Sequence, residues 1–405
     1  MKIRSITCFC NPLDKDFETM LKRLAVLANT CKEGFEKKGW EVQTLRLATI
    51  PFGQYTTTQD VIQKITALET SAQTLGFNYL SVGPARLSTL EDYRLITEIL
   101  KATRNVFVSG LLAHPQRGIS MQAVRACAKI ITEAAAITPD GFTNLRFCAM
   151  SHVLPFTPFF PAAYSYGTQP AFALAMEAAD AAIDGFRDVK DITEGRNKML
   201  SRLEAAADEL SKIAKLNARE AGISFKGFDF SLAPFPEDWC SLGCALENLG
   251  IPQLGYMGTL TAAAILAEAL DQGNWQHVGF NGLMLPVLED SILAERTSSG
   301  HFTIKDLLMV SAVCGTGLDT VPLPGDISAE EIEPLLMDIA ALSLRLRKPL
   351  TARLMPVPGL KAGDLTAFNF EFFKNGKVLD YPAGKITGAL AKSDWLKIRK
   401  REALF

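Results

Sequence analysis

A chain of 405 residues exceeds the roughly 250 to 300 residues that a single hydrophobic core usually organises, which favours two lobes or one large α/β barrel. Its 42 Lys and Arg residues nearly balance its 44 Asp and Glu residues, so a net charge of −2 gives no reason to expect nucleic acid or an anionic membrane as a partner. No apolar run reaches the about 20 residues that span a bilayer. We therefore expect a small-molecule ligand, no nucleic acid and no membrane, and we leave a homo-oligomer open.

Short strand-like runs alternate with helix-length amphipathic runs from the start of the chain. Strands are expected at 3–9, 41–47, 77–82, 106–111 and 145–151, and helices at 17–38, 60–75, 91–103 and 120–136. This βαβα order favours a mainly parallel sheet, either open and doubly wound or closed into a barrel.

The segment Leu154-Pro-Phe-Thr-Pro-Phe-Phe-Pro-Ala-Ala-Tyr164 interrupts this order, and its aromatic content indicates a lid or pocket wall, since a solvated linker is normally polar. A second alternating stretch follows it. Helices are expected at 170–186, 194–218, 237–249, 259–270, 287–297, 304–313 and 329–344, and strands at 224–232, 277–285 and 350–355. Near the end, the run from Phe368 to Leu379 predicts a hairpin with its turn at Asn375-Gly376.

The eight cysteines are scattered, mostly in apolar stretches, which is typical of a reducing compartment. With a start of Met1-Lys-Ile-Arg4 that matches no targeting segment, we expect a cytoplasmic protein. Cys8 and Cys10 would share a strand face, and Cys240 and Cys244 a helix face, but neither pair has a second pair nearby. We therefore expect no metal site, and the cofactor is unknown.

The stretch Ser311-Ala-Val-Cys-Gly-Thr-Gly-Leu-Asp-Thr-Val-Pro-Leu-Pro-Gly-Asp326 is the first candidate site. Its Gly and Pro residues cannot continue the preceding helix, so an irregular loop is expected. Cys314 is the candidate nucleophile or acid-base thiol, and Gly315 and Gly317 would let backbone N–H groups approach an oxyanion. The alternative is a structural cysteine in the last turn of a helix that Gly315 ends.

Two further residues are candidates for moving protons or orienting a substrate. Asp319 lies in the same Gly- and Pro-rich stretch with no capping role in view. His152 follows the strand at 145–151, at the strand end where α/β folds place ligand-contacting residues. A structural role is the alternative for both.

Three more residues are candidates for substrate binding. Arg353 is a charge within the apolar strand at 350–355, where it must face solvent, an acid or an anionic ligand. Glu289 follows a strand-like run, although it also fits the first turn of a helix begun by Pro286. Thr259 opens a helix after two glycines, a setting that suits an anion, and a plain N-cap is the alternative.

Several long motifs in the same order resemble domain of unknown function family 711. They are Met1-Lys-Ile-Arg-Ser-Ile-Thr7, Thr157-Pro-Phe-Phe-Pro-Ala-Ala-Tyr164, Phe228-Asp-Phe-Ser-Leu-Ala-Pro-Phe-Pro236, Gly282-Leu-Met-Leu-Pro-Val-Leu-Glu-Asp-Ser291, the stretch around Cys314, and Lys348-Pro-Leu-Thr-Ala-Arg-Leu-Met-Pro-Val-Pro-Gly359. The resemblance implies a ten-stranded α/β barrel of two parallel half-sheets, similar to that of pyruvate formate-lyase and other glycyl radical enzymes. No motif like Arg-Val-x-Gly-Tyr lies near the C-terminus, so we expect the barrel without the radical. The family has no established activity.

We therefore expect one barrel domain over residues 1–383, with possible halves 1–165 and 220–383 and a helical segment 166–219 between them, followed by a basic tail at 384–405. The leading hypothesis is an enzyme of unassigned reaction acting on a small anionic metabolite, with Cys314, Asp319 and His152 as catalytic residues. The alternatives are a non-catalytic metabolite-binding or sensor protein, and a structural role in which the motifs serve fold or oligomer contacts.

Overall fold

The computed structural model describes residues 1–55, 60–382 and 384–400. Its first half alternates strands and helices, and the five strands predicted there are confirmed to within a few residues. The elements are β1 (Lys2–Cys10), α1 (Phe17–Glu36), β2 (Leu45–Thr49), η1 (Phe52–Gln54), α2 (Val61–Thr74), β3 (Tyr79–Ala85), α3 (Leu90–Ala102), β4 (Val106–Leu111), β5 (Ala113–His114), β6 (Gly118–Ser120), α4 (Met121–Ala135), η3 (Phe142–Arg146) and β7 (Phe147–Ser151).

The second half adds four strands to the same sheet and most of the remaining helices. The elements are β8 (Ala171–Glu177), α5 (Ala179–Phe186), α6 (Ile192–Ala221), β9 (Ser224–Asp229), η4 (Asp238–Cys240), α7 (Leu242–Asn248), α8 (Thr259–Asp271), α9 (Ser291–Ser298), α10 (Ile304–Cys314), β10 (Gly317–Pro324), α11 (Ala329–Leu346), β11 (Leu350–Val357), α12 (Gly388–Lys392) and β12 (Trp395–Leu396). The last of these, β12, joins β6 and β5 in a separate three-stranded sheet.

The fold is a mixed α/β structure around a nine-stranded sheet with the order β10-β11-β7-β4-β3-β2-β1-β8-β9. The middle strands β7, β4, β3, β2 and β1 are parallel neighbours. The direction reverses on both sides of them, because β8 runs antiparallel to β1 and β11 antiparallel to β7. The sheet is therefore mostly parallel, with a parallel pair of opposite direction at each end.

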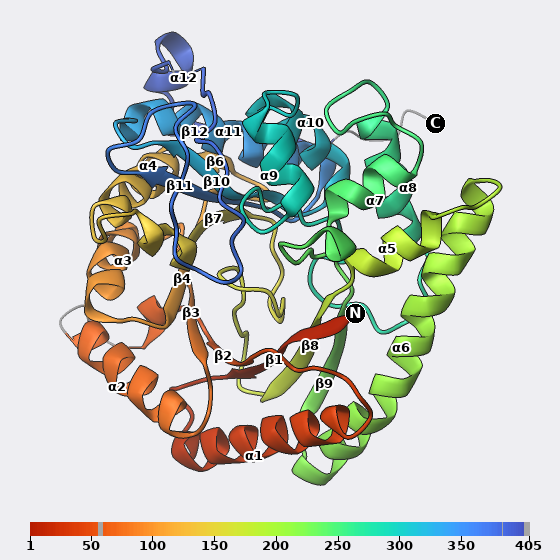
Figure 1. Ribbon diagram of the computed structural model, residues 1–405. Helices are drawn as coiled ribbons and strands as arrows, with labels where there is room; N and C mark the ends of the chain where they lie inside the picture. The colour runs from red at the N-terminus through yellow and green to blue at the C-terminus, as the bar shows by residue number, and fades with distance from the viewer. Residues whose placement is uncertain (56–59, 383, 401–405) are drawn as a thin grey trace.

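Helices cover the outer side of this curved sheet. Figure 1 shows α1, α2, α3 and α6 outside the strands, and these helices contact β1, β3, β4 and β9 respectively. Strands β2, β7 and β8 are buried along their whole length, as expected for parallel strands covered on both faces. A large apolar cluster fills the outer layer, and a smaller one that includes Phe9 and Phe107 lies on the inner face.

In the described part of the chain, isolated bridges and backbone hydrogen bonds of the segment 276–287 link the two ends of the sheet. Phe228 is bridged to His277 and Leu232 to Leu283, while Pro286 is bridged to Asp319 of β10, all in parallel. Within the described residues, no named strand fills the gap between β9 and β10. The predicted ten-stranded closed barrel is thus not confirmed, whereas the large α/β sheet is.

Several secondary-structure predictions were wrong, and the strand expected at 277–285 is present only as isolated bridges at His277 and Leu283. The segment 170–186 was expected to be one helix, but Ala171–Glu177 is the fully buried strand β8. A continuous apolar run does not distinguish a buried strand from a buried helix, and pairing with β1 decides it here. The stretch after Cys314 was expected to be an irregular loop, but Gly317–Pro324 is the strand β10, whose register shift beside β11 and position at the end of the sheet accommodate its prolines.

The predicted hairpin after Phe368 is also not formed. An isolated antiparallel bridge joins Leu365 to Lys377, and the side chain of Asn375 closes the segment by accepting from Phe368 N and donating to Phe368 O. Asn375 therefore acts through its side chain and not as a turn residue. The result is an irregular strap, defined as residues 368–373, that packs against the sheet end.

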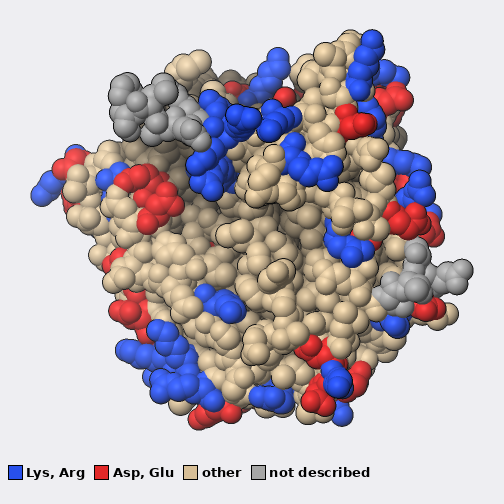
Figure 2. Space-filling view, turned by 180° about the vertical axis from the view of Figure 1, so that it is seen from behind, with Lys and Arg blue, Asp and Glu red and all other residues tan. Residues whose placement is uncertain are grey.

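The surface shows no dominant sign of charge on the face seen in Figure 2. Basic and acidic side chains alternate around its rim, and its middle is largely uncharged. Among the described residues, no helix combines the length and apolar character needed to cross a membrane.

Candidate functional site

A cavity of about 110 Å³ lies on the inner side of the curved sheet. Its walls come from β1, β2, β3, β4, β7, β10 and β11, from the segments 159–162 and 280–289, and from the strap. The aromatic segment 154–164 thus contributes to a pocket wall, as the sequence predicts.

Alternation along the strands determines which side chains reach this cavity. Successive side chains of a strand point to opposite faces, so Arg46 of β2 lines the cavity while Leu45 and Leu47 join the outer core. The same alternation places Cys148 of β7 and Arg353 of β11 in the cavity wall. A charge between two core residues is the sequence signal that identifies Arg353 as a candidate, and Arg46 between Leu45 and Leu47 carries the same signal.

The cavity lies toward the amino ends of the five central strands. Arg46, Tyr79 and Cys148 are the second, first and second residues of their strands. His152 follows the opposite, carboxyl end of β7 and does not line the cavity. Its Nδ1 lies 3.1 Å from Ser343 Oγ, and burial, followed by the nearby charge of Arg347, lowers its pKa.

Three of the predicted residues meet in one ionic cluster. Arg353 donates from Nη2 to Glu289 Oε1 at 2.9 Å and from Nε to Asp319 Oδ1. Glu289 uses its other oxygen, Oε2, to accept from Arg4 Nη2 at 2.9 Å. Burial lowers the pKa of Arg353, but the charges of Asp319 and Glu289 raise it by more, so the net direction is upward.

Arg4 has a second acidic partner deeper in the protein. Its Nη1 donates to Glu177 Oε2 at 3.3 Å, and Gln43 Nε2 donates to the same oxygen at 2.7 Å. Burial raises the pKa of Glu177, against the opposing effect of Arg4. Arg4 and Arg353 are therefore both matched by carboxylates of the protein.

Arg46 differs from both, because it forms no ion pair with any carboxylate of the described residues. It is only 8% exposed, and its one side-chain hydrogen bond in the described structure runs from Nε to Thr44 Oγ1 at 2.9 Å. Its guanidinium carbon lies 5.2 Å from the ring centre of Phe160 and 5.8 Å from that of Tyr79. Burial, followed by the positive charge of Arg4, lowers the pKa of Arg46 to about 9, so it stays charged at neutral pH.

The remaining walls are mostly aromatic. Tyr79, Phe107 and Phe160 form a chain of edge-on contacts, each 5.3 Å between ring centres. From the strap, Phe370 and Phe372 lie 5.2 Å apart, and both line the cavity. Arg46 thus lies beside aromatic rings in a cavity whose wall also holds the ionic cluster around Glu289 and Arg353.

The thiol in this cavity is Cys148 and not Cys314. Burial raises the pKa of Cys148 well above its usual range, with a smaller opposing effect from Arg353, so this thiol is protonated at neutral pH. Cys314 is buried at the end of α10, where its Sγ accepts from Thr316 N at 3.5 Å. Thr316 lines the cavity, which places Cys314 one layer behind the wall.

Gly315 and Gly317 both serve the backbone structure, one at a helix end and the other in a strand. Gly315 ends α10 in the left-handed region with a φ of 78°, as the alternative interpretation predicts. A side chain at Gly317 would place its Cβ 2.2 Å from Thr351 O, so glycine lets β10 pair closely with β11. Neither residue lines the cavity, and a role in contacting an oxyanion stays a prediction.

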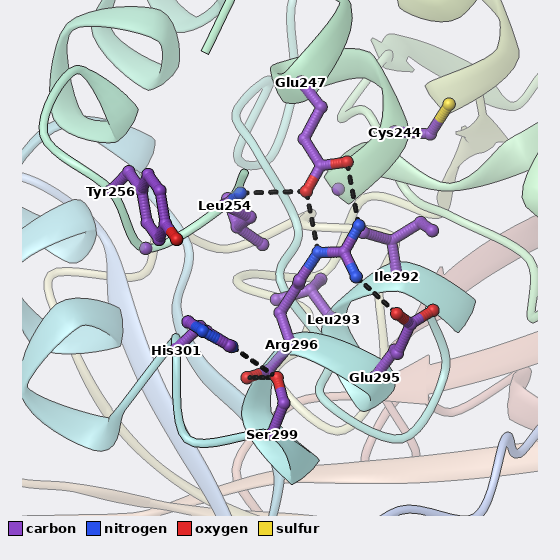
Figure 3. A network of polar contacts seen from close by, with 12 residues as sticks. Cys244, Glu247, Leu254, Tyr256, Ile292, Leu293, Glu295, Arg296, Ser299 and His301 are labelled. Carbon is purple, nitrogen blue, oxygen red and sulfur yellow. Dashed lines mark hydrogen bonds and ion pairs between the residues drawn. The ribbon is translucent and has the colours of Figure 1, made fainter. Parts of the chain in front are cut away.

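Thr259 belongs to a different region, near the polar network in Figure 3. Glu247 of α7 accepts from Leu254 N at 2.8 Å and from Arg296 of α9 at 2.9 Å and 3.2 Å, which fixes the loop before α8. Thr259 Oγ1 donates to Tyr256 O at 2.8 Å and accepts from the N–H four residues earlier. Its hydroxyl is thus used within this turn, and Thr259 does not line the cavity.

No group of three or more His, Cys, Asp or Glu side chains in the described part of the chain is placed to hold a metal ion. The groups that the cavity offers to a ligand are instead one unpaired guanidinium, two paired ones and aromatic rings.

Comparison with known proteins gives a family without an assigned activity. The family model described as "Uncharacterised ACR (DUF711)" matches residues 1–371. A UPF0210 protein of Pyrobaculum arsenaticum is 31% identical over 281 residues, which cover 66% of this chain and 61% of that protein. A UPF0210 protein of Acetivibrio thermocellus is 28% identical over 375 residues, covering 86% and 81%. The chain thus spans about three fifths of the first relative's length and about four fifths of the second's.

Proposed function

We propose a function from the pocket alone, because the chain belongs to the uncharacterised family DUF711 and that name states no activity. The proposed function is the binding of a small organic anion on the inner side of the sheet, with Arg46 as the group that binds its charge. This corresponds to the metabolite-binding alternative of the sequence analysis.

The observation that carries the proposal is the unpaired guanidinium of Arg46. Burying a charge without a partner is costly, and buried charges in proteins are normally paired. A nearly buried arginine that lines a cavity and has no carboxylate partner in the described structure is therefore best matched by an anion from outside. A guanidinium presents parallel N–H donors that suit a carboxylate in a bidentate geometry.

The predicted carboxylate-binding role of Arg353 is less well supported. Its guanidinium already donates to Asp319 and Glu289, so an incoming anion would compete with two protein carboxylates. Arg353 is better suited to hold those carboxylates in place. In this proposal, Arg46 takes the role that the sequence suggested for Arg353.

Catalysis by Cys314, Asp319 and His152 stays a prediction. Asp319 is engaged by Arg353, and Cys314 and His152 lie outside the cavity wall. These positions favour a binding function as the primary one.

We also propose that the sheet closes through the segment 277–287 as a tenth strand. The three parallel bridges to Phe228, Leu232 and Asp319 support this, as do backbone hydrogen bonds from Leu283 N to Cys314 O and from Val287 N to Asp319 O. Closure would enclose the cavity within a ring of strands.

The test is thermal unfolding of the purified chain with a panel of small carboxylates, each paired with its neutral amide. A ligand at about 100 times its dissociation constant stabilises the folded state by about 2.7 kcal/mol, which a melting curve detects. We expect carboxylates to stabilise the wild-type chain, and Arg46→Gln to abolish the effect.

Arg94→Gln is the matched control, because Arg94 is exposed on α3 and pairs only with Glu91 of the same helix in the described structure. This variant should respond like the wild type. Equal stabilisation of the wild type and Arg46→Gln by every carboxylate would overturn the proposal.

A further inference from the structure

We infer that the cavity selects a monocarboxylate with a short apolar body and rejects dianions, and that Glu289 sets this charge selectivity. The inference rests on the proposed function, because it concerns the ligand of the same cavity. It adds three points about the ligand site: the ligand carries one negative charge, the rest of the ligand is apolar, and Glu289 determines the preference for a monoanion over a dianion.

One cation of the cavity wall has no acidic partner among the described residues, so the wall offers an unpaired cation to one negative charge of a ligand. Arg353 and Arg4 are each held by one oxygen of Glu289, at 2.9 Å in both cases. Asp319 provides a further carboxylate to Arg353, and Glu177 provides one to Arg4. Arg46 is the remaining cation of the cavity wall without an acidic partner among the described residues.

A second negative charge on the ligand would be repelled. Glu289 and Asp319 both line the cavity, and like charges that share a low-dielectric site disfavour each other. A phosphate monoester carries about −1.5 to −2 charges at neutral pH, so it would bring such a second charge. The wall therefore favours a carboxylate over a phosphate and a monoanion over a dianion.

The size and lining of the cavity limit the rest of the ligand. An engineered apolar cavity of about 150 Å³ holds one benzene molecule, and the volume here is about 110 Å³. The lining includes the rings of Tyr79, Phe107 and Phe160 and those of the strap, and the rings of Tyr79 and Phe160 lie beside the guanidinium of Arg46. A body of a few carbon atoms without further polar groups fits these walls, because a buried hydroxyl or amide without a partner would be disfavoured.

Glu289 is the carboxylate that Arg4 and Arg353 share, while Glu177 and Asp319 each bind one of them. Replacing Glu289 by Gln removes this shared negative charge from the cavity wall but keeps the size of the side chain. The wall would gain one net positive charge, so a second carboxylate on the ligand would be repelled less. Glu289 is thus a positioning and specificity residue and not one that contacts the ligand's charge.

The experiment measures the binding of three probes with the same five-carbon chain by ligand-observed NMR titration at neutral pH. The probes are pentanoate as monoanion, glutarate as dianion and pentanamide as neutral molecule. For the wild type we expect pentanoate to bind at least about tenfold more tightly than the other two. For Glu289→Gln we expect the preference for pentanoate over glutarate to shrink or reverse.

Glu295→Gln is the matched control, since Glu295 is an exposed carboxylate that pairs with the neighbouring Arg296. It should keep the wild-type preference. If Glu289→Gln does not fold, the comparison of pentanoate with glutarate in the wild type still decides the inference.

The possible failures can be told apart. Glutarate binding as tightly as pentanoate to the wild type, or no binding of pentanoate, would overturn the inference while anions of another class could still bind through Arg46. Equal binding of pentanoate and pentanamide, unchanged in Arg46→Gln, would overturn the proposed anion-binding function as well. An unchanged preference in a folded Glu289→Gln would remove the role of Glu289.

Discussion

Arg353 Nη2 lies 2.9 Å from Glu289 Oε1, which joins β11 to the segment before α9 across 64 positions of the chain. Both side chains are nearly buried. Through Glu289 the contact extends to Arg4 of β1, which also lines the cavity. The ionic cluster thus connects both halves of the chain around the proposed ligand site.

The first prediction concerns stability. Arg353→Gln leaves Asp319 without its arginine partner and Glu289 with Arg4 alone, and breaking a buried pair by removing one member costs about 3–5 kcal/mol. Arg46→Gln removes a buried charge that has no acidic partner in the described structure, so we expect little loss of stability or a small gain. Urea unfolding of the two variants without ligand measures both effects. Equal destabilisation by the two substitutions would show that Arg46 is paired in the free protein.

The second prediction concerns pH. The pKa of Arg46 is lowered to about 9, by burial first and then by Arg4, with smaller effects of Tyr79, Glu289 and Arg353. Because the charged form binds the anion, affinity should be constant near neutral pH and fall as pH rises through about 9. Because its pKa is lowered in the folded state, Arg46 loses its proton at a lower pH in the folded protein than in the unfolded chain. Above about pH 9 the unfolded chain therefore binds more protons, and the free energy of unfolding should rise with pH.

Pentanoate titrations from neutral to alkaline pH check this. Arg46→Lys is the informative comparison, since a lysine keeps a positive charge that titrates with its own midpoint. A wild-type affinity that stays flat above about pH 9 would mean that Arg46 keeps its proton there or that another group binds the anion, and the affinity of Arg46→Gln for pentanoate distinguishes the two.

The third prediction concerns the cysteines. Cys244 is half-buried, and the other seven are buried. We expect an alkylating reagent to label Cys244 first, while Cys148 reacts slowly because burial keeps its thiol protonated. Mass spectrometry of each peptide against time gives the eight rates. Rapid and selective labelling of Cys314 would instead support the nucleophile that the sequence suggested.

The sequence predicts the layout of the fold better than its details. Period-2 and period-3.6 patterns located β1 to β4 and β7 because each is a short β-rich run next to an amphipathic helix. The pattern failed for β8, where Ala171–Glu177 is buried throughout and apolar except for Glu177, and for β10, where Gly and Pro residues suggested a loop. In both cases long-range pairing, which a local pattern does not contain, determines the structure.

Only part of the site could be predicted from the sequence, because the contacts between its residues are also long-range. Arg353 and Glu289 were identified as charges in or after strand-like runs, and Asp319 as an acid of the Gly- and Pro-rich stretch; the structure brings the three together. Arg46 carries the same signal, but only the structure tells which of these arginines has carboxylate partners. Cys314 was chosen for its glycine neighbours, and those glycines end a helix and permit strand pairing instead of opening onto the cavity.

The last prediction concerns the strap. Phe372 is partly exposed, lines the cavity, and lies with its ring centre 5.2 Å from Arg4 Cζ and 5.2 Å from the ring of Phe370. Phe372→Ala removes part of the apolar wall, so pentanoate should bind about fivefold more weakly, as expected for losing about 1 kcal/mol of apolar contact. Stability should change little, because the side chain is not part of the buried core.

Leu365→Ala is the control for this prediction, since Leu365 is 66% exposed just before the strap and does not line the cavity. It should bind pentanoate like the wild type. The length of the probe gives a second check: acetate, which lacks the apolar body, should lose little affinity in Phe372→Ala. If both probes weaken equally, Phe372 acts by positioning Arg4 and the charged end of the site, whereas a loss confined to pentanoate places the apolar end of the ligand against the strap.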